Sequence, residues 1–387
     1  MKSLACLIFL FSSSLFAQNR NSVPLQTALS FSNKCATGQE VTISAVGDVL
    51  LHTALQNQAF NSPQTYNSLW PMMGPLFQKF DVSYANFEGP SAEGLTATGH
   101  FEDTGFKPNL NVYTSYPSFN YHPLLVRDLM ALGLDVVSTA NNHALDRREK
   151  GADMTIEAMQ KNGLKFTGTH LRGSQNQGWH TLTETKGLRI AWLACTFSTN
   201  GIPDKENQVL FCYQDRQKVL NYVHALALDP SISGVIVTPH WGEEYSQSPA
   251  KQEIEFGQQL IDAGALAVLG THPHVIQPWK KYESSISGKE GLIVFSSGNF
   301  VNGNFLRVQT QVGLMLGLKL VLDSASNKLK IKSARYLPLV MKRNPYRVEP
   351  IFKDENVEPQ FSSVWKSMYP QQNRITSRED LFPDECP

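Results

Sequence analysis

The chain has 387 residues, of which 41% are hydrophobic and 18% are charged, and this composition supports one large globular domain or two smaller ones. Lysine and arginine together number 34, as do aspartate and glutamate, so the formal net charge is zero. The sequence therefore lacks the basic field that nucleic-acid binding requires, and we expect no nucleic-acid partner. An anionic ligand would have to be attracted locally, for instance by bound metal ions.

The first 17 residues have the pattern of a secretory signal peptide. Lys2 provides a positive charge, residues 4–16 are apolar with a short serine patch, and the small residue Ala17 ends the segment. The apolar run is too short to span a membrane. We therefore expect cleavage after Ala17 and an exported protein, either periplasmic or extracellular, with residues 18–40 as a polar leader.

Removal of this segment leaves the cysteines Cys35, Cys195, Cys212 and Cys386. Four cysteines in an exported protein allow three pairings. Cys195 and Cys212 flank a short loop, whereas Cys35 and Cys386 lie near the two chain ends. We expect the disulfides Cys195–Cys212 and Cys35–Cys386, and the alternative is four free thiols.

Short β-rich runs alternate with helical segments from residue 41 to about residue 300, which predicts an α/β fold. Strands are expected at 41–46, 81–85, 134–140, 164–168, 189–194, 235–239, 266–270 and 292–295. Helices are expected at 124–132, 152–162 and 213–228, and between Ser248 and Gly264. Two consecutive strands at 312–322 and 329–341 predict a hairpin, which we expect to complete a second sheet. Residues 346–387 are rich in proline and polar residues and are expected to form a C-terminal extension.

Polar side chains follow six of the predicted strands, at the point where each strand ends. These strand-end residues are Asp48, Asn86, Glu88, Asn142, His143, His240, His272, His274 and Asn299. Because parallel strands bring their carboxyl ends to one edge of a sheet, we expect these side chains to converge. Carboxylates, imidazoles and an amide together suit a two-metal centre with a bridging carboxylate.

The same motifs, in the same order, resemble those of the bacterial poly-γ-glutamate capsule biosynthesis (CapA-like) family, a branch of the calcineurin-like metallophosphatase fold. The resemblance covers about residues 41–300, and its specific pieces are Asn141-Asn142-His143, His240-Trp241-Gly242 and His272-Pro273-His274. It implies a four-layer α/β/β/α sandwich of two mixed sheets, with residues 41–345 as the family domain.

The resemblance also implies two groups of ligands for two divalent ions, which could be manganese, iron, zinc or magnesium. The first group is Asp48, Glu88 and His274. The second group, which shares the bridging carboxylate, is Glu88, Asn142, His240 and His272. His143 matches the position that protonates a leaving group or steadies a phosphoryl oxygen.

Four more polar residues are expected to bind substrate or to orient ligands, and these are Asn86, Asp146, Glu244 and Asn299. Glu244 could orient His240 or be a solvated carboxylate. Asn299 could contact substrate or cap a turn. Arg147 and Arg148 depart from the family pattern, and they could pair with an anionic substrate or lie exposed on a helix. The family pattern also has Asp-x-His at the first strand, whereas here the nearest histidine after Asp48 is His52.

The function that these features predict is an exported metal-dependent hydrolase acting on a phosphoester or an amide in the cell envelope. The alternative is a non-catalytic envelope factor, which uses the metal site to bind an anionic polymer or to assist a membrane polyglutamate synthase. The expected partners are accordingly an anionic small molecule, an envelope polymer or that synthase.

Overall fold

The computed structural model describes residues 27–174, 178–383 and 386. The predicted signal peptide and the leader up to residue 26 lie outside this part of the chain. Among the described helices, none is both long and apolar enough to cross a membrane.

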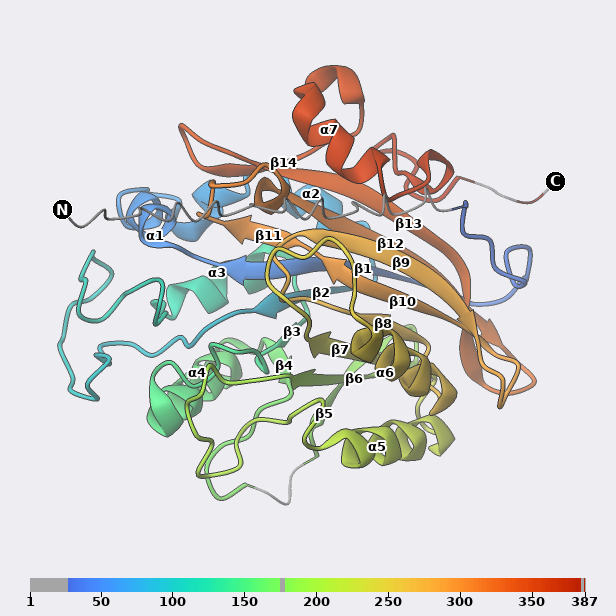
Figure 1. The fold of residues 1–387 in the computed structure, drawn as a ribbon, viewed down its shortest axis with the longest axis horizontal. Helices are drawn as coiled ribbons and strands as arrows, with labels where there is room; N and C mark the ends of the chain where they lie inside the picture. The colour runs from blue at the N-terminus through green and yellow to red at the C-terminus, as the bar shows by residue number, and fades with distance from the viewer. Residues whose placement is uncertain (1–26, 175–177, 384–385, 387) are drawn as a thin grey trace, which may run out of the picture.

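Two mixed β-sheets form the centre of the molecule (Figure 1). The eight-stranded sheet has the order β14 (Arg347–Pro350), β13 (Lys328–Lys342), β12 (Val312–Asp323), β1 (Glu40–Leu50), β2 (Val82–Phe87), β3 (Val136–Ser138) and β4 (Lys165–Thr167), with β11 (Asn299–Asn302) beside β1. The six-stranded sheet has the order β5 (His180–Thr185), β6 (Leu188–Thr196), β7 (Gly234–His240), β8 (Ala267–Leu269), β10 (Glu290–Ser297) and β9 (Ile276–Glu283). Strands β1 to β4 run parallel, and so do β6, β7, β8 and β10.

The hairpin β12–β13 pairs antiparallel with β1 and so extends the first sheet. The prediction that it would complete a second sheet is wrong, because the six-stranded sheet is built entirely from strands between residues 180 and 297. Alternation of apolar residues identifies a strand and its buried face, but not the neighbour to which its backbone bonds.

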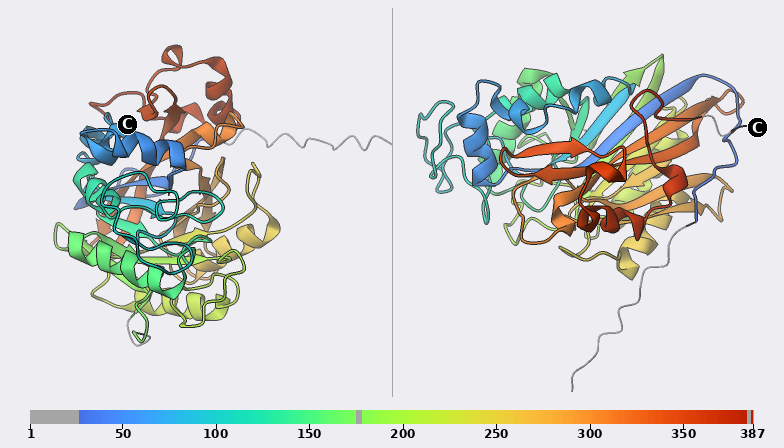
Figure 2. Two further views of the ribbon diagram at one scale, coloured as in Figure 1. Left: turned by 90° about the vertical axis from the view of Figure 1, so that its left-hand side faces the viewer. Right: turned by 90° about the horizontal axis from the view of Figure 1, so that it is seen from above.

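Helices cover both outer faces of the sheet pair, which confirms the predicted sandwich of two mixed sheets (Figures 1 and 2). The first sheet packs against α1 (Thr53–Phe60), α2 (Gly74–Phe77), α3 (Leu124–Leu132) and α4 (Arg148–Asn162). The second packs against α5 (Arg216–Leu228) and α6 (Lys251–Asp262). Strand β6 shows why both faces are apolar: Ile190 and Trp192 enter the core between the sheets, whereas Ala191 and Leu193 face the helices.

The segment predicted as a C-terminal extension contributes to the core between the sheets. After β14, helix α7 (Pro359–Lys366) leads to Tyr369, whose ring lies 4.9 Å from the rings of both Trp279 on β9 and Tyr336 on β13. The Tyr369 hydroxyl donates to the Gln277 carbonyl over 2.7 Å. This segment therefore bridges the two sheets along one side of the sandwich.

Both expected disulfides are present, Cys35–Cys386 and Cys195–Cys212. The first joins positions 351 residues apart and ties the two ends of the described chain together. The second closes a loop of 17 residues between β6 and α5.

Arg147 is buried at the base of the long loop formed by residues 91–123. All five N–H groups of its guanidinium have acceptors: the carbonyls of Leu95, Val112 and Asp146, and the hydroxyls of Thr114 and Ser118. Burial lowers the pKa of Arg147 to about 10, so the group stays charged at neutral pH. Neither expected role fits Arg147, because it fastens the loop, whereas Arg148 is exposed as one alternative held.

The substitution Arg147→Lys should destabilise this loop. A lysine ammonium has three N–H donors and cannot bond to all five acceptors that surround the planar guanidinium. We expect a loss of about 2 kcal/mol or more in the free energy of unfolding and faster proteolysis within residues 91–123. The neighbouring exposed change Arg148→Lys is the matched control and should stay within about 0.5 kcal/mol of the wild type. Equal effects of the two changes in urea unfolding would contradict this role.

Candidate metal centre

The strand-end residues meet at the carboxyl edges of the two sheets. Asp48 on β1 lies opposite Asn86 on β2 and Asn299 on β11. His240 ends β7 and forms a bridge with Thr271, which follows β8. The parallel strands of each sheet thus deliver their polar ends to one place, as the sequence predicted.

The first predicted ligand group lies together in the structure. Donor atoms of Asp48, Glu88 and His274 are all within 4.8 Å of one another, and all three side chains are buried. His274 Nδ1 lies 3.2 Å from Asp48 Oδ2, and His274 Nε2 lies 3.7 Å from Glu88 Oε1. This spacing suits ligands that surround a single cation.

The second predicted group shares Glu88 with the first. Donor atoms of Glu88, His240 and His272 are also within 4.8 Å of one another. His240 Nε2 is 2.9 Å from the Asn142 side-chain oxygen, 3.2 Å from His272 Nδ1 and 3.8 Å from Glu88 Oε1. Four candidate ligand atoms therefore face a common point.

Glu88 provides the test of whether metal ions fit this site. Its side chain is fully buried, and neither carboxylate oxygen has a hydrogen-bond partner among the residues that the structure describes. An unpaired buried carboxylate is very costly, whereas cations on its two sides would satisfy both oxygens. Oxygen and imidazole donors of this kind are common ligands of divalent metals, so the residues fit a two-ion centre.

The pKa shifts have the same physical cause. Burial and the Asp48 carboxylate raise the pKa of Glu88 well above its usual range. Burial alone would lower the pKa of His274, but Glu88 and Asp48 outweigh it and raise this pKa to about 10. Burial and neighbouring imidazoles hold the pKa values of His240 and His272 well below their usual range. Glu88 is therefore stabilised by positive charge beside it, and the neutral imidazoles of His240 and His272 are available as ligands.

Asn299 orients His274. Its amide nitrogen donates to the carbonyls of His274 and Thr310, each over 2.9 Å, which directs its oxygen toward the His274 ring. That oxygen lies 3.0 Å from His274 Nδ1, so Nδ1 carries the proton and donates it. Nε2, which faces Glu88, is therefore the atom that a metal ion would bind in place of a proton. Of the roles expected for Asn299, this contact fits the orientation of a ligand.

His240 is held by Thr271 and Asn86, which approach its Nδ1 atom to 3.0 and 3.2 Å. Asn86 also donates to Asp48 over 2.7 Å, so it contacts ligands of both groups. Of the two alternatives for Glu244, its exposed side chain agrees with a solvated carboxylate. Its ligand atom groups with those of His272 and His274.

His143 lies beside the second group and is fixed by Asp146. The Asp146 carboxylate is 2.7 Å from His143 Nδ1 and accepts 2.6 Å from the backbone N–H of Phe119. Because an ionised carboxylate only accepts, Nδ1 of His143 carries a proton and Nε2 is the atom available for chemistry. The Phe119 ring packs edge-on against His143 at 4.7 Å.

The backbone at the histidine pair is unusual. His272 has φ 102° and His274 has φ 58°, a left-handed region that side chains other than glycine rarely adopt. Such backbone costs about 1–3 kcal/mol per residue and persists where the surrounding structure imposes it.

Close packing is also needed at Gly47, where an added Cβ would lie 1.7 Å from the Gly298 carbonyl oxygen.

Sequence reasoning missed Thr271 and Tyr121. The Tyr121 hydroxyl donates to the Glu88 carbonyl over 2.6 Å and accepts from the Leu51 N–H over 3.3 Å, so it ties the end of β2 to that of β1. Tyr121 was visible only as one of several aromatics in a loop. Thr271 directly precedes His272 in the sequence, but the sequence does not show toward which residue its hydroxyl points.

The sequence model described as "Bacterial capsule synthesis protein PGA_cap" matches residues 42–304. The chain belongs to this family. The family resemblance expected from the motifs is therefore confirmed, and the matched range includes every proposed metal ligand.

Two curated relatives show the same similarity. The chain is 27% identical over 270 residues to "Capsule biosynthesis protein CapA" of Bacillus anthracis, covering 68% of this chain and 60% of that protein. It is 25% identical over 262 residues to "PGA biosynthesis protein CapA" of Bacillus subtilis, covering 67% of this chain and 63% of that protein. The match thus spans less than two thirds of either relative.

Among solved structures, the chain is similar to a novel phosphatase from Mycoplasma pneumoniae, with a TM-score of 0.44 and 13% identity over 79% of this chain and 95% of that one. It is also similar to the NAD nucleotidase of Haemophilus influenzae, with a TM-score of 0.46 and 11% identity over 87% of this chain and 57% of that one.

The substitution Asn299→Ala should weaken metal binding, because His274 Nδ1 loses the nearer of its two acceptors, the other being Asp48, and the ring loses the contact that orients it. We expect affinity to fall about ten- to a hundredfold in a chelator-competition titration. Asn221→Ala, on the exposed face of α5, is the control and should leave affinity unchanged. Wild-type affinity in Asn299→Ala would show that the amide does not orient the ligand.

Proposed function

We propose that this protein is a metal-dependent hydrolase that cleaves a phosphoester or an amide in the cell envelope. This reaction would contribute to the synthesis of an anionic polymer. The observation that carries the proposal is the buried Glu88 carboxylate between two groups of candidate ligands, with both oxygens unpaired. The same residues are proposed as ligands in the two groups described above. Membership in the capsule synthesis family supports the polymer context.

Two divalent ions held there would lower the pKa of a bound water and polarise the bond to be cleaved. Asp48 and Glu88 would neutralise only part of the ions' positive charge. The site would therefore attract a phosphate or carboxylate group, although the formal net charge of the whole chain is zero. An anionic substrate is therefore concentrated by the site itself.

His143 is proposed as the group that gives a proton to the leaving atom. Its Nδ1 proton is engaged by Asp146, so transfer takes place at Nε2. The Asp146 carboxylate can also balance the charge of an imidazolium until the proton is transferred. Phe119 excludes water from one face of the ring and limits its rotation.

An envelope location is part of the proposal. It is supported by the disulfides, which persist in oxidising compartments, by the signal-like first 17 residues and by the relatives' names. The proposed partners are an anionic envelope polymer and a membrane synthase that makes it. The division into a family domain at 41–345 and a C-terminal extension also stays a proposal.

Glu88→Gln tests the metal centre with an almost isosteric side chain that cannot carry charge. We expect elemental analysis to show about two ions per wild-type chain and far fewer in the variant, with chelator-sensitive phosphodiesterase or γ-glutamyl amidase activity lost in parallel. The exposed substitution Glu157→Gln on α4 is the control. Metal content equal to wild type in Glu88→Gln would refute the proposal. Bound metal without turnover, together with retention on polyglutamate, would favour the non-catalytic binding role.

His143→Gln tests the proton transfer. We expect the rate to fall about 10²- to 10⁴-fold on an ester with a poor leaving group and much less on a 4-nitrophenyl ester, whose leaving group needs no proton. Metal content should stay at the wild-type level. A loss of equal size on both esters would argue against this role of His143.

A further inference from the structure

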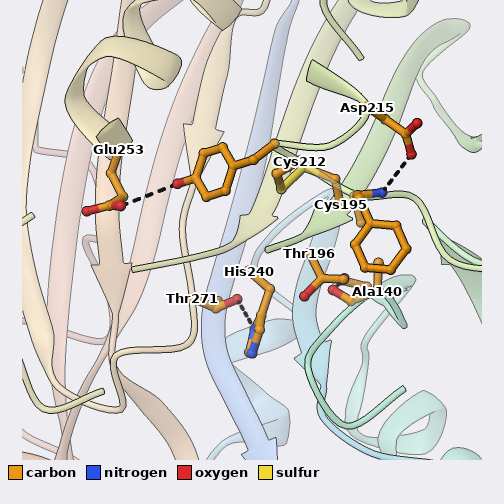
Figure 3. The surroundings of a disulfide bond; sticks show 12 residues. Ala140, Cys195, Thr196, Cys212, Asp215, His240, Glu253 and Thr271 are labelled. Atoms are coloured by element: carbon orange, nitrogen blue, oxygen red, sulfur yellow. Dashed lines mark hydrogen bonds between the residues drawn. A yellow bond between two sulfur atoms is a disulfide. The ribbon is translucent and has the colours of Figure 1, made fainter. Parts of the chain in front are cut away.

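The segment that follows β6, residues 197–212, reaches the second ligand group. Its base is closed by the Cys195–Cys212 disulfide and by two backbone hydrogen bonds between Thr196 and residues 210 and 212, of 2.9 and 2.8 Å. Figure 3 shows the disulfide next to Thr196, whose register partner on β7 is His240. We call this segment the stapled loop.

The stapled loop directs two side chains at the proposed metal ligands. The Phe197 N–H donates to the His240 carbonyl over 2.9 Å, and the Phe197 ring lies 4.5 Å from the His272 ring. Farther along, the Asn200 side-chain oxygen accepts from the Asn142 amide nitrogen over 3.3 Å. The loop thus contacts each of the three ligands that belong only to the second group.

The contact with Asn200 bears on which atom of Asn142 faces the metal position. An amide binds a cation through its oxygen, because its nitrogen is only a donor. The Asn142 oxygen is 2.9 Å from His240 Nε2, on the side of the other candidate ligands. Rotating this amide by half a turn would put its nitrogen toward His240 and its oxygen against the oxygen of Asn200. With its oxygen toward Asn142 and its nitrogen 3.5 Å from His143 Nδ1, Asn200 therefore favours the orientation in which Asn142 can be a ligand.

Backbone conformation holds Asn200 in this position. Asn200 has φ 52° and Gly201 has φ 74°, so two successive left-handed residues turn the chain back. The turn is closed by the Ile202 N–H, which donates to the Thr199 carbonyl over 3.0 Å, and the Asn200 N–H donates to the Ser198 hydroxyl over 3.0 Å. The disulfide limits how far this turn can move from the strand ends.

We propose that Asn200 is a positioning residue for the second metal site, which holds the Asn142 amide with its oxygen directed inward, and that the Cys195–Cys212 disulfide keeps it there. This inference rests on the proposed two-metal centre and adds a dependence of that centre on the stapled loop.

The test measures the affinity and number of bound Mn²⁺ ions in the full chain with its disulfides intact, by chelator competition and elemental analysis. Asn200→Ala should weaken one ion about ten- to a hundredfold and leave the other unchanged. Asn200→Asp, which presents only acceptors, should bind both ions at least as tightly as the wild type. Asn207→Ala is the matched control, because Asn207 lies exposed in the same loop with the same φ of 52°.

The double substitution of Cys195 and Cys212 by Ser should weaken the same ion, and adding Asn200→Ala to it should cause little further loss, because both changes act on one contact. Wild-type affinity in Asn200→Ala, or an equal loss in Asn200→Asp, would overturn the role of Asn200. Unchanged affinity in the Cys double variant would overturn the role of the disulfide. A wild-type protein that binds no Mn²⁺ would instead refute the metal centre itself, and this inference would fall with it.

Discussion

A fully buried carboxylate without a hydrogen-bond partner lies where the two sheets meet. Glu88 follows β2, and its Oε1 atom lies 3.7 Å from His274 Nε2 and 3.8 Å from His240 Nε2, distances that are too long for hydrogen bonds and suit ligands of shared cations. Folding takes this group out of water at a high cost, and the neighbouring His274 offsets only part of it, because burial and Asp48 still raise the pKa of Glu88 well above its usual range. Bound cations beside Glu88 would supply the missing positive charge and explain why two groups of candidate ligands surround this carboxylate.

Several features far apart in sequence serve to hold this arrangement. Gly47 lets β11 approach β1, the left-handed backbone of His272 and His274 turns two rings inward, and Asn299 fixes one of those rings. The long loop at 91–123 is fastened by Arg147 and contributes Phe119 and Tyr121 to the support of the site. The centre is therefore a product of both sheets and two long loops, and no single motif could build it.

Many residues of the site could be predicted from the sequence, because parallel strands place their carboxyl ends at the same edge of a sheet. A run of apolar residues that stops at a polar residue places that residue at a sheet edge, so Asp48, Glu88, His240 and His272 could be expected to meet. The family resemblance assigned them to two groups, and the structure brings the same groups together. The order of helices and strands also followed from apolar periodicity.

What could not be predicted depends on tertiary contacts. The β12–β13 hairpin pairs with β1 through backbone hydrogen bonds, and the order of side chains in the sequence does not show which strand such bonds will join. The burial of Arg147 depends on acceptors contributed by a loop with no regular structure, and the contact of Asn200 with Asn142 joins residues 58 positions apart. Glu244 follows His240 by four residues in the sequence, but its exposed side chain groups with His272 and His274.

The most direct measurement is anomalous X-ray diffraction from crystals of the wild-type protein grown with Mn²⁺, recorded on both sides of the manganese absorption edge. Two anomalous peaks are expected on opposite sides of the Glu88 carboxylate, one beside Asp48 and His274 and the other beside Asn142, His240 and His272. An empty site in crystals that hold Mn²⁺ elsewhere, or a single peak that does not touch Glu88, would contradict the two-metal centre.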